Sequence, residues 1–171
     1  MPRMSIRRSR FMPWVAALLL AACAGLPSSL KPGDTLESVL QKLGKASAEY
    51  PRAGGGRMLQ FSSAPFGLHT TNVEFDAAGR LLRWEEALTE AHFNAVEPGL
   101  SAAAVRERFG PPMRIWGVRY HDQTVWTYRY DNMQCQVFHV GLTPQGVVED
   151  TSYGPDPMCE RDGFLAHRRA H

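Results

Sequence analysis

Apolar residues recur at a helical spacing near the beginning of the sequence and predict a short helix over residues 36–43. Its apolar positions are Leu36, Val39, Leu40 and Leu43. They stand at i, i+3, i+4 and i+7, which is the spacing of one helix face. Thr35 or Asp34 caps the first turn, and Gly44 follows the last. A helix of two turns is unstable alone, so we expect its apolar face to lie on a sheet.

The same pattern occurs again 66 residues later, between residues 98 and 110. The shift places Pro32 on Pro98, Gly33 on Gly99, Thr35 on Ser101, Val39 on Val105, Leu43 on Phe109 and Gly44 on Gly110. Ser101 is the expected N-cap of the second helix, Gly110 supplies a left-handed residue at its end, and Pro111 and Pro112 prevent it from continuing. The sequence is therefore a tandem repeat.

Three runs of strand-forming residues follow each predicted helix. They span residues 57–61, 69–75 and 80–84 in the first copy, and 125–130, 136–142 and 147–151 in the second. Polar turns separate the last two runs of each copy, and Gly146 of the second turn falls on Gly79 of the first. Each copy is predicted to be a short helix followed by a three-stranded antiparallel meander.

The predicted fold class is α+β, with the helices on one face of the sheet. We place copy one at residues 32–87 and copy two at 88–160, with a flexible tail at 161–171. Residues 88–96 add a short helix capped by Thr89. A unit of this size is marginally stable alone, so we expect the two sheets to sit side by side and stabilise each other.

Residues 1–22 have the pattern of a secretory signal peptide, with four arginines before a short apolar run. The segment Leu20-Ala21-Ala22-Cys23 at its end resembles the lipobox of bacterial lipoproteins. That resemblance implies cleavage after Ala22 and acyl chains, palmitate among them, on Cys23. Residues 23–31 are then a tether, and Ala24 after the cysteine favours the outer membrane, facing the periplasm. An ordinary signal peptide with a chance cysteine is the alternative.

The charge of the chain changes when this segment is removed. The full sequence has a net charge of +2, but the four arginines of residues 1–22 leave 15 basic residues against 17 acidic ones, a net of −2. A weakly acidic chain gives no support to nucleic-acid binding. The expected partners are membrane lipid, through the acyl chains, and envelope proteins.

Two cysteines, Cys135 and Cys159, remain after Cys23. An even pair in an oxidising compartment predicts a structural disulfide. A metal site needs more ligands, and a redox pair favours closer spacing. The chain carries no Gly-x-Ser-x-Gly, His-Glu-x-x-His or Cys-x-x-Cys motif. We therefore expect no enzyme activity, no cofactor and no metal, and we interpret His121-Asp122 as a polar turn.

A binding face is the better-supported site. By strand alternation, the sheet face away from the helices carries Asn72, Glu74, Thr127, Arg129, Val137 and His139. The segment 113–120 adds Trp116, Arg119 and Tyr120, residue types enriched at interface hot spots. The candidate partner-binding residues are Trp116, Arg119, Tyr120, Arg129 and His139. Alternatively, Trp116 and Tyr120 close the core or extend the first hairpin of copy two.

The second copy is similar to the BamE (SmpA/OmlA) family of outer-membrane lipoproteins. The matching positions are Gly99-Leu100-Ser101, Val105, Phe109-Gly110, Pro112, Trp126-Thr127-Tyr128 and Gly146-Val147-Val148. Copy one has Ala46 in place of the proline and lacks the Trp-x-Tyr. The resemblance implies a lipid-anchored, non-enzymatic module that supports outer-membrane protein assembly or envelope integrity. The tandem arrangement is also similar to that of the β-lactamase inhibitor protein, which implies the alternative of a protein inhibitor or secreted enzyme.

Overall fold

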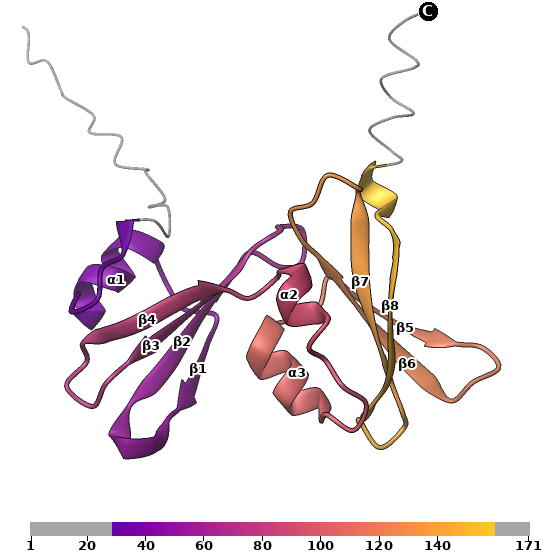
Figure 1. Cartoon of the computed structure of the whole chain (residues 1–171), viewed down its shortest axis with the longest axis horizontal. Helices are drawn as coiled ribbons and strands as arrows, with labels where there is room; N and C mark the ends of the chain where they lie inside the picture. The colour runs from indigo at the N-terminus through magenta and orange to yellow at the C-terminus, as the bar shows by residue number, and fades with distance from the viewer. Residues whose placement is uncertain (1–28, 160–171) are drawn as a thin grey trace, which may run out of the picture.

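Two four-stranded antiparallel sheets, each preceded by an eight-residue helix, form an α+β fold (Figure 1). The computed structural model describes residues 29–159. The signal peptide, Cys23, most of the tether and the tail at 161–171 lie outside the described residues. Among the described residues, no helix is both long and apolar enough to cross a membrane.

The first half contains α1 and the sheet β1–β4. Its elements are α1 (Leu36–Leu43), β1 (Ala48–Pro51), a short 3-10 turn η2 (Ala53–Gly55), β2 (Arg57–Ser62), β3 (Thr70–Phe75) and β4 (Leu81–Glu86). The second half contains α2, α3 and the sheet β5–β8. Its elements are α2 (Glu90–Phe93), α3 (Ala102–Phe109), β5 (Arg114–Val118), β6 (Gln123–Arg129), β7 (Gln136–Leu142) and β8 (Val148–Pro155).

The predicted helices and their caps are confirmed. Thr35 and Ser101 each accept a hydrogen bond from the backbone amide three residues later, and Thr89 does the same for α2. Gly44 and Gly110 both have φ of +82°, as expected for the residues that end α1 and α3. The sequence therefore defines where α1 and α3 begin and end, whereas α2 is shorter than the predicted 88–96 and ends at Phe93.

The predicted number of strands is wrong, because each sheet has a fourth strand at its edge. The additional strands are β1 and β5, and β5 extends the first hairpin of the second half by pairing with β6. Every residue of β5 except Val118 is exposed, so the strand has no buried positions to give it a period-two pattern. β1 is four residues long and ends at Pro51, a residue tolerated only at a strand edge.

Each helix is tied to the last turn of its own sheet by the same hydrogen bonds. Gly33 donates to the Leu81 carbonyl and Gly99 to the Val148 carbonyl, both at 2.8 Å. The bridge Thr35–Arg80 recurs as Ser101–Val147, and a bulge occurs near the end of both β3 and β7. These bonds hold the apolar side of each helix against its own sheet.

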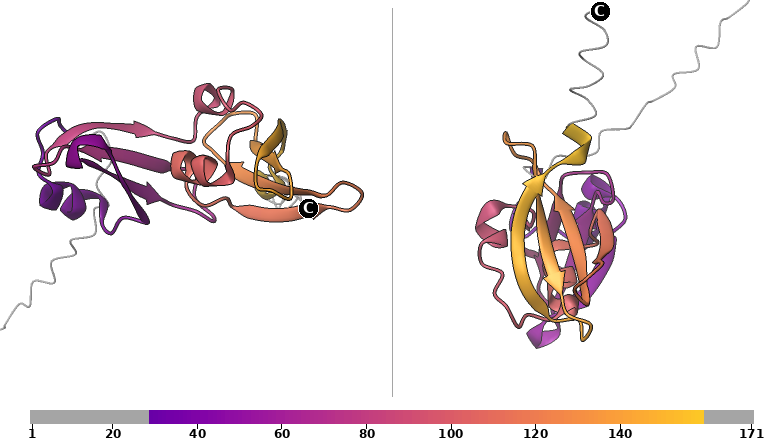
Figure 2. Two further views of the ribbon diagram at one scale, coloured as in Figure 1. Left: turned by 90° about the horizontal axis from the view of Figure 1, so that it is seen from below. Right: turned by 90° about the vertical axis from the view of Figure 1, so that its right-hand side faces the viewer.

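The layers alternate, because α3 lies between the two sheets (Figures 1 and 2). Val105 and Phe109 of α3 face the β5–β8 sheet and are fully buried. The opposite side of α3 contacts the β1–β4 sheet on the face away from α1. The sheets therefore do not sit side by side as expected, and the face that carries Asn72 is covered rather than open.

The second half has the larger core, built around five buried aromatic rings. Phe93 stacks on Phe138 with ring centroids 4.3 Å apart and meets Phe109 and Tyr130 edge to face at 5.1 Å. The core of the first half is aliphatic apart from Phe75, with Val39 and Val73 at its centre. α2 contributes Phe93 to the second core, which explains why this short helix is part of that half.

Candidate binding surface

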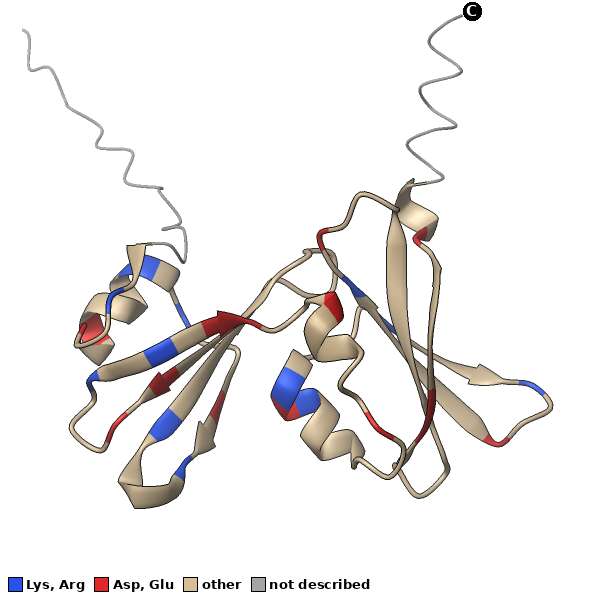
Figure 3. Cartoon of the chain, in the orientation of Figure 1, with Lys and Arg blue, Asp and Glu red and all other residues tan. Residues whose placement is uncertain are grey.

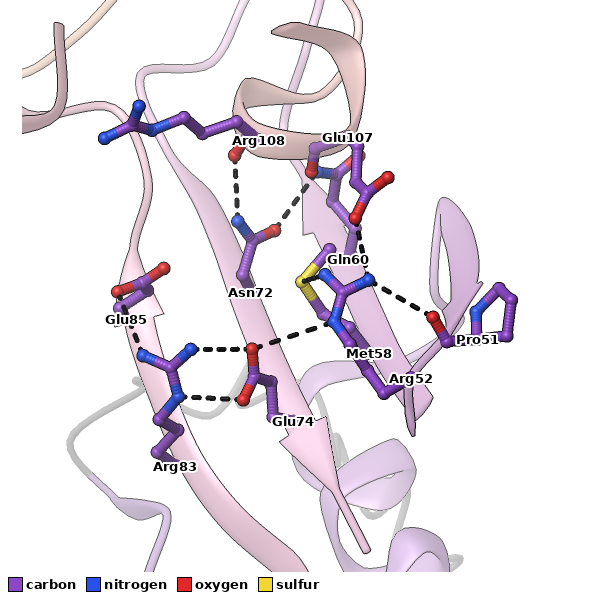
Figure 4. Close-up of polar contacts among 10 residues, drawn as sticks. All are labelled: Pro51, Arg52, Met58, Gln60, Asn72, Glu74, Arg83, Glu85, Glu107 and Arg108. Carbon is purple, nitrogen blue, oxygen red and sulfur yellow. Dashed lines mark hydrogen bonds and ion pairs between the residues drawn. The ribbon is translucent and has the colours of Figure 1, made fainter. Parts of the chain in front are cut away.

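The contact between the two halves shows how a sheet face of this protein holds a helix end (Figure 4). The last carbonyl groups of a helix have no partner within the helix. At the end of α3, the Glu107 carbonyl accepts from Gln60 Nε2 at 2.9 Å and the Arg108 carbonyl from Asn72 Nδ2 at 2.8 Å. Gln60 also donates to Asn72 Oδ1 at 3.1 Å. Two side-chain amides of the β1–β4 sheet therefore cap a helix of the other half.

Ion pairs surround this contact. Arg52 of the first half meets Glu107 of α3 at 2.7 Å, and Arg83 meets Glu74 at 2.7 Å. The hydrogen bond from Arg83 to Glu74 raises the pKa of the arginine above its ordinary value. Basic and acidic residues are interspersed along this sheet (Figure 3), and those at the contact line a pocket of about 270 Å³ beside the helix end. The charges at this contact are therefore paired with one another, and the residues serve to hold the two halves together.

Gly110 permits the close approach of α3. A Cβ at this position would lie 3.3 Å from Gln60 Oε1, Ser62 Oγ and Thr70 Cγ2, in addition to being strained by the positive φ. The equivalent residue after α1, Gly44, has no atom within 4 Å of such a Cβ. One helix end is thus packed against a sheet, and the other is open.

The face of the β5–β8 sheet away from α3 carries a polar chain at the corresponding place. Thr127 and His139 pair across β6 and β7, as Gln60 and Asn72 pair across β2 and β3. Trp116 Nε1 donates to Thr127 Oγ1 at 3.2 Å, and Thr127 Oγ1 lies 3.0 Å from His139 Nδ1. Since Thr127 is 3% exposed, its hydroxyl proton needs the Nδ1 acceptor. This assigns the proton of the neutral imidazole to Nε2.

His139 therefore presents one hydrogen-bond donor on this face. Its Nε2 would lie 2.8 Å from a Cβ at position 154, so only glycine leaves room for the ring there. The Trp116 ring stands edge to face with the imidazole at 6.2 Å. β7 itself carries no charged residue (Figure 3). The centre of the face combines Trp116 and the buried Val125 and Val137 with the donor of His139, and Arg114, Arg129 and Asp150 lie around it.

Burial lowers the pKa of His139, because the charged form is poorly solvated. A histidine with a lower pKa in the folded chain stabilises the fold fully above its unfolded pKa of about 6.5, and that contribution is lost as the pH falls through the folded value. The free energy of unfolding should therefore fall less steeply on acidification in His139→Asn than in the wild type. Urea unfolding at a series of pH values measures this, with His121→Asn at the exposed hairpin turn as the matched control. If the free energy of unfolding depends on pH in the same way in the wild type and in His139→Asn, the pKa of His139 is not lowered by burial.

The other predicted binding residues separate into two groups. Arg119 and Tyr120 lie in the turn between β5 and β6, where Tyr120 is 88% exposed, and Trp116 on β5 is 38% exposed. Arg129 is different, since its side chain is 14% exposed and meets Asp156 at 2.6 Å, with Asp156 at 5%. Arg129 also donates to the Phe66 carbonyl of the first half. It holds the structure together and is not available to a partner.

Both Cys135 and Cys159 are present as thiols in the structure. The two thiols lie within hydrogen-bond distance of each other. This hydrogen bond with Cys135 is the main cause that raises the pKa of Cys159 to about 11. The backbone joins the same segments, since Asp156 donates to the Cys135 carbonyl at 2.7 Å. The disulfide stays a prediction for the protein in an oxidising compartment.

A groove beside α1 is the other hollow that bears on binding. An open groove of about 590 Å³ lies between α1 and its sheet, lined by the apolar Leu36, Leu40, Ala46 and Leu59 and by the charged Lys45, Glu49 and Arg57. Within residues 29–159, no group of three or more His, Cys, Asp and Glu side chains is placed to hold a metal ion.

Comparisons with known proteins add little to this picture. No protein-family model and no curated protein sequence matches the chain. Among solved structures, a cysteine-rich secretory protein from Staphylococcus aureus aligns with 13% identity and a TM-score of 0.29. The alignment covers 74% of this chain but 45% of that one, so the chain spans less than half its length. A likeness this weak carries no argument about fold or function.

Sequence reasoning placed His139 on the sheet face but missed its place in a chain with Thr127 and Trp116. The signal was available in the repeat, because an offset of 67 residues places Thr127 on Gln60 and His139 on Asn72. What the sequence does not contain is the position of α3 on the β1–β4 sheet. Without that contact, the equivalence of the two faces has no meaning for binding.

Proposed function

We propose that this chain is a lipid-anchored contact module of the bacterial envelope, a duplicated BamE-like unit that works by binding and not by chemistry. The observation that carries the proposal is the outer face of the β5–β8 sheet, the face away from α3. It repeats the face by which the β1–β4 sheet holds a helix, yet none of α1, α2 and α3 covers it (Figure 2).

The duplication is supported by the backbone. Three pairs of glycines one repeat apart have matching positive φ angles: 89° and 95° at Gly33 and Gly99, 82° at both Gly44 and Gly110, and 72° and 71° at Gly79 and Gly146. Because glycine can adopt either sign of φ, matching positive values show that the backbone makes the same turn at each pair of positions. Together with the repeated helix-to-turn hydrogen bonds, they favour two copies of one folding unit of a helix and a four-stranded meander.

The location is proposed from the sequence. Cys23 at the end of the lipobox-like segment is the site of lipidation, and the anchored protein lies on the periplasmic side of the outer membrane. A single acyl chain binds membranes only marginally, whereas two or more anchor a protein stably. The partners are then envelope proteins, met by Trp116, His139 and the β5–β6 turn with Arg119 and Tyr120.

The anchor is tested by metabolic labelling. Cells that express the full chain are grown with radioactive palmitate, and the protein is recovered from membrane and soluble fractions. Label in the wild type, none in Cys23→Ser, and release of Cys23→Ser from the membrane are expected. An unlabelled wild-type protein that floats free contradicts the anchor.

The contact role is tested in the same strain. Loss of the gene is expected to raise sensitivity to detergent, and the wild type to restore resistance. Trp116→Ala and His139→Ala should fail to restore it, whereas Leu82→Ala, at an exposed position of β4 outside this face, should succeed. Full rescue by all three variants contradicts a role for this face. An enzymatic or inhibitory activity of the purified protein that Trp116→Ala or His139→Ala abolishes would favour the alternative of an inhibitor or secreted enzyme.

A further inference from the structure

The molecule contains one completed helix-to-sheet contact and the two unmatched parts of a second. The completed contact joins the end of α3 to Gln60 and Asn72 on the β1–β4 sheet. The unmatched parts are the end of α1, which corresponds to the end of α3, and the outer face of the β5–β8 sheet, which corresponds to the outer face of β1–β4. They lie at opposite ends of the molecule (Figure 1).

We propose that copies of this chain associate head to tail, with the C-terminal end of α1 of one copy on the outer face of the β5–β8 sheet of the next. The inference rests on the proposed function, because it names the partner of that face. A contact between different surfaces of identical chains is heterologous and extends into rows unless it closes into a ring. A second copy is therefore able to add at either end.

The hydrogen-bond donors and acceptors agree with this arrangement. In the completed contact, Asn72 donates to the Arg108 carbonyl. In the other copy, the Lys42 carbonyl of α1 corresponds to the Arg108 carbonyl of α3, and His139 of β7 corresponds to Asn72 of β3. The single donor that His139 presents, Nε2–H, is the one required. Gly44 leaves the helix end as open as Gly110 makes it in the completed contact.

The charges agree as well. Arg52 and Glu107 form an ion pair in the completed contact. Arg114 pairs with Thr127 as Ala48 pairs with Gln60, so the counterpart of Arg52 is Val118, which Arg119 follows in the turn. The counterpart of Glu107 is Gln41, so neither of these two positions brings an unpaired charge into the contact.

A new charge pair is available at the other side of the helix end. Arg108 and Arg83 line the same pocket beside α3. Their counterparts are Lys42 and Asp150, so the second contact would place Lys42, which meets Asp34 of its own copy at 2.6 Å, opposite a further carboxylate. The Asp150 side chain lies over Gly141 on the outer face, where it is exposed. Asp150 at the position equivalent to Arg83 therefore adds a charge attraction that the completed contact does not have.

The test uses site-specific photocrosslinking between two differently tagged full-length copies expressed in the same cells. A photoreactive residue replaces Gln41 in one copy, and its matched control replaces Glu37, which is exposed like Gln41 but lies one turn further from the C-terminal end of α1. We expect a covalent dimer from position 41 but not from 37. The attached peptide of the second copy should come from β5, β6 or β7.

Variants of the second copy test the contact chemistry. His139→Ala should reduce the crosslinked fraction roughly tenfold, as expected from the loss of one hydrogen bond at the centre of an interface. His139→Asn, which restores the side chain found at position 72, should preserve it. A crosslink that is absent, that maps elsewhere, or that survives His139→Ala unchanged overturns the inference. If position 41 gives no dimer while a photoreactive residue at position 116 captures a different envelope protein, self-association fails and the proposed function stands. If neither position gives a product, both fail.

Discussion

Replacing Phe109 by alanine should destabilise the protein by about 3–5 kcal/mol, the range for removing a buried aromatic side chain. Phe109 is fully buried and contacts the rings of Phe93 at 5.1 Å and Tyr128 at 5.6 Å. It also ends the helix that both sheets share, so the cavity weakens two layers at once. Urea denaturation followed by circular dichroism measures the loss.

Two matched variants make this result specific. Leu43 occupies the equivalent position in α1 but is only partly buried, so Leu43→Ala should cost clearly less. Phe109→Leu places the α1 residue in α3 and should cost about 1–2 kcal/mol, because most of the volume is retained. An equal loss in Phe109→Ala and Leu43→Ala would contradict the shared role of α3.

Arg129→Met is the second change for which a large effect is expected, about 3 kcal/mol or more. Breaking a buried ion pair from one side leaves an uncompensated charge, and the Asp156 carboxylate is 5% exposed. The variant also loses the hydrogen bond of 2.9 Å to the Phe66 carbonyl, which links the two halves. Thermal or urea unfolding measures the change.

The control for this prediction is an exposed pair. Arg83 meets Glu74 at 2.7 Å, but its side chain is 63% exposed, so Arg83→Met should cost less than about 1 kcal/mol. The double variant Arg129→Met/Asp156→Asn removes both charges and should recover a large part of the stability. If Arg129→Met costs no more than Arg83→Met, Arg129 belongs among the surface contact residues after all.

The elements that the sequence predicted well are those determined by local chemistry. Thr35 and Ser101 are polar residues before apolar helical spacing, and Gly44 and Gly110 follow the last turns. Each signal depends on a few neighbouring residues, so it survives without knowledge of the rest of the fold. The internal repeat strengthened each assignment by giving it twice.

The edge strands and the order of the layers were not predictable in the same way. β5 has almost no buried residue and therefore no alternation to detect. The position of α3 between the sheets depends on contacts across the chain, such as that between Asn72 and the Arg108 carbonyl. Ala104 and Glu107 appear in the sequence as an ordinary solvent-facing side of a helix. Only the assembled structure shows that a sheet lies against them.

The same limitation explains the binding face. From the sequence, Trp116, His139 and Arg129 are equally good candidates for contact with a partner. The structure distinguishes them, because Arg129 forms an ion pair with the buried Asp156, whereas the Nε2–H of His139 has no partner among the described residues. Strand alternation assigns Arg129 and His139 to the same sheet face, and it does not show which of the two side chains is already paired.

The central claim is that the outer face of the β5–β8 sheet is where this protein meets its partner. The most direct measurement is photocrosslinking in intact cells with the photoreactive residue at Trp116, compared with the same residue at Leu82, which is exposed on β4 of the first half. The account predicts a discrete covalent product from position 116, lost in His139→Ala, and none from position 82. Equal products from both positions, or none from either, would contradict it.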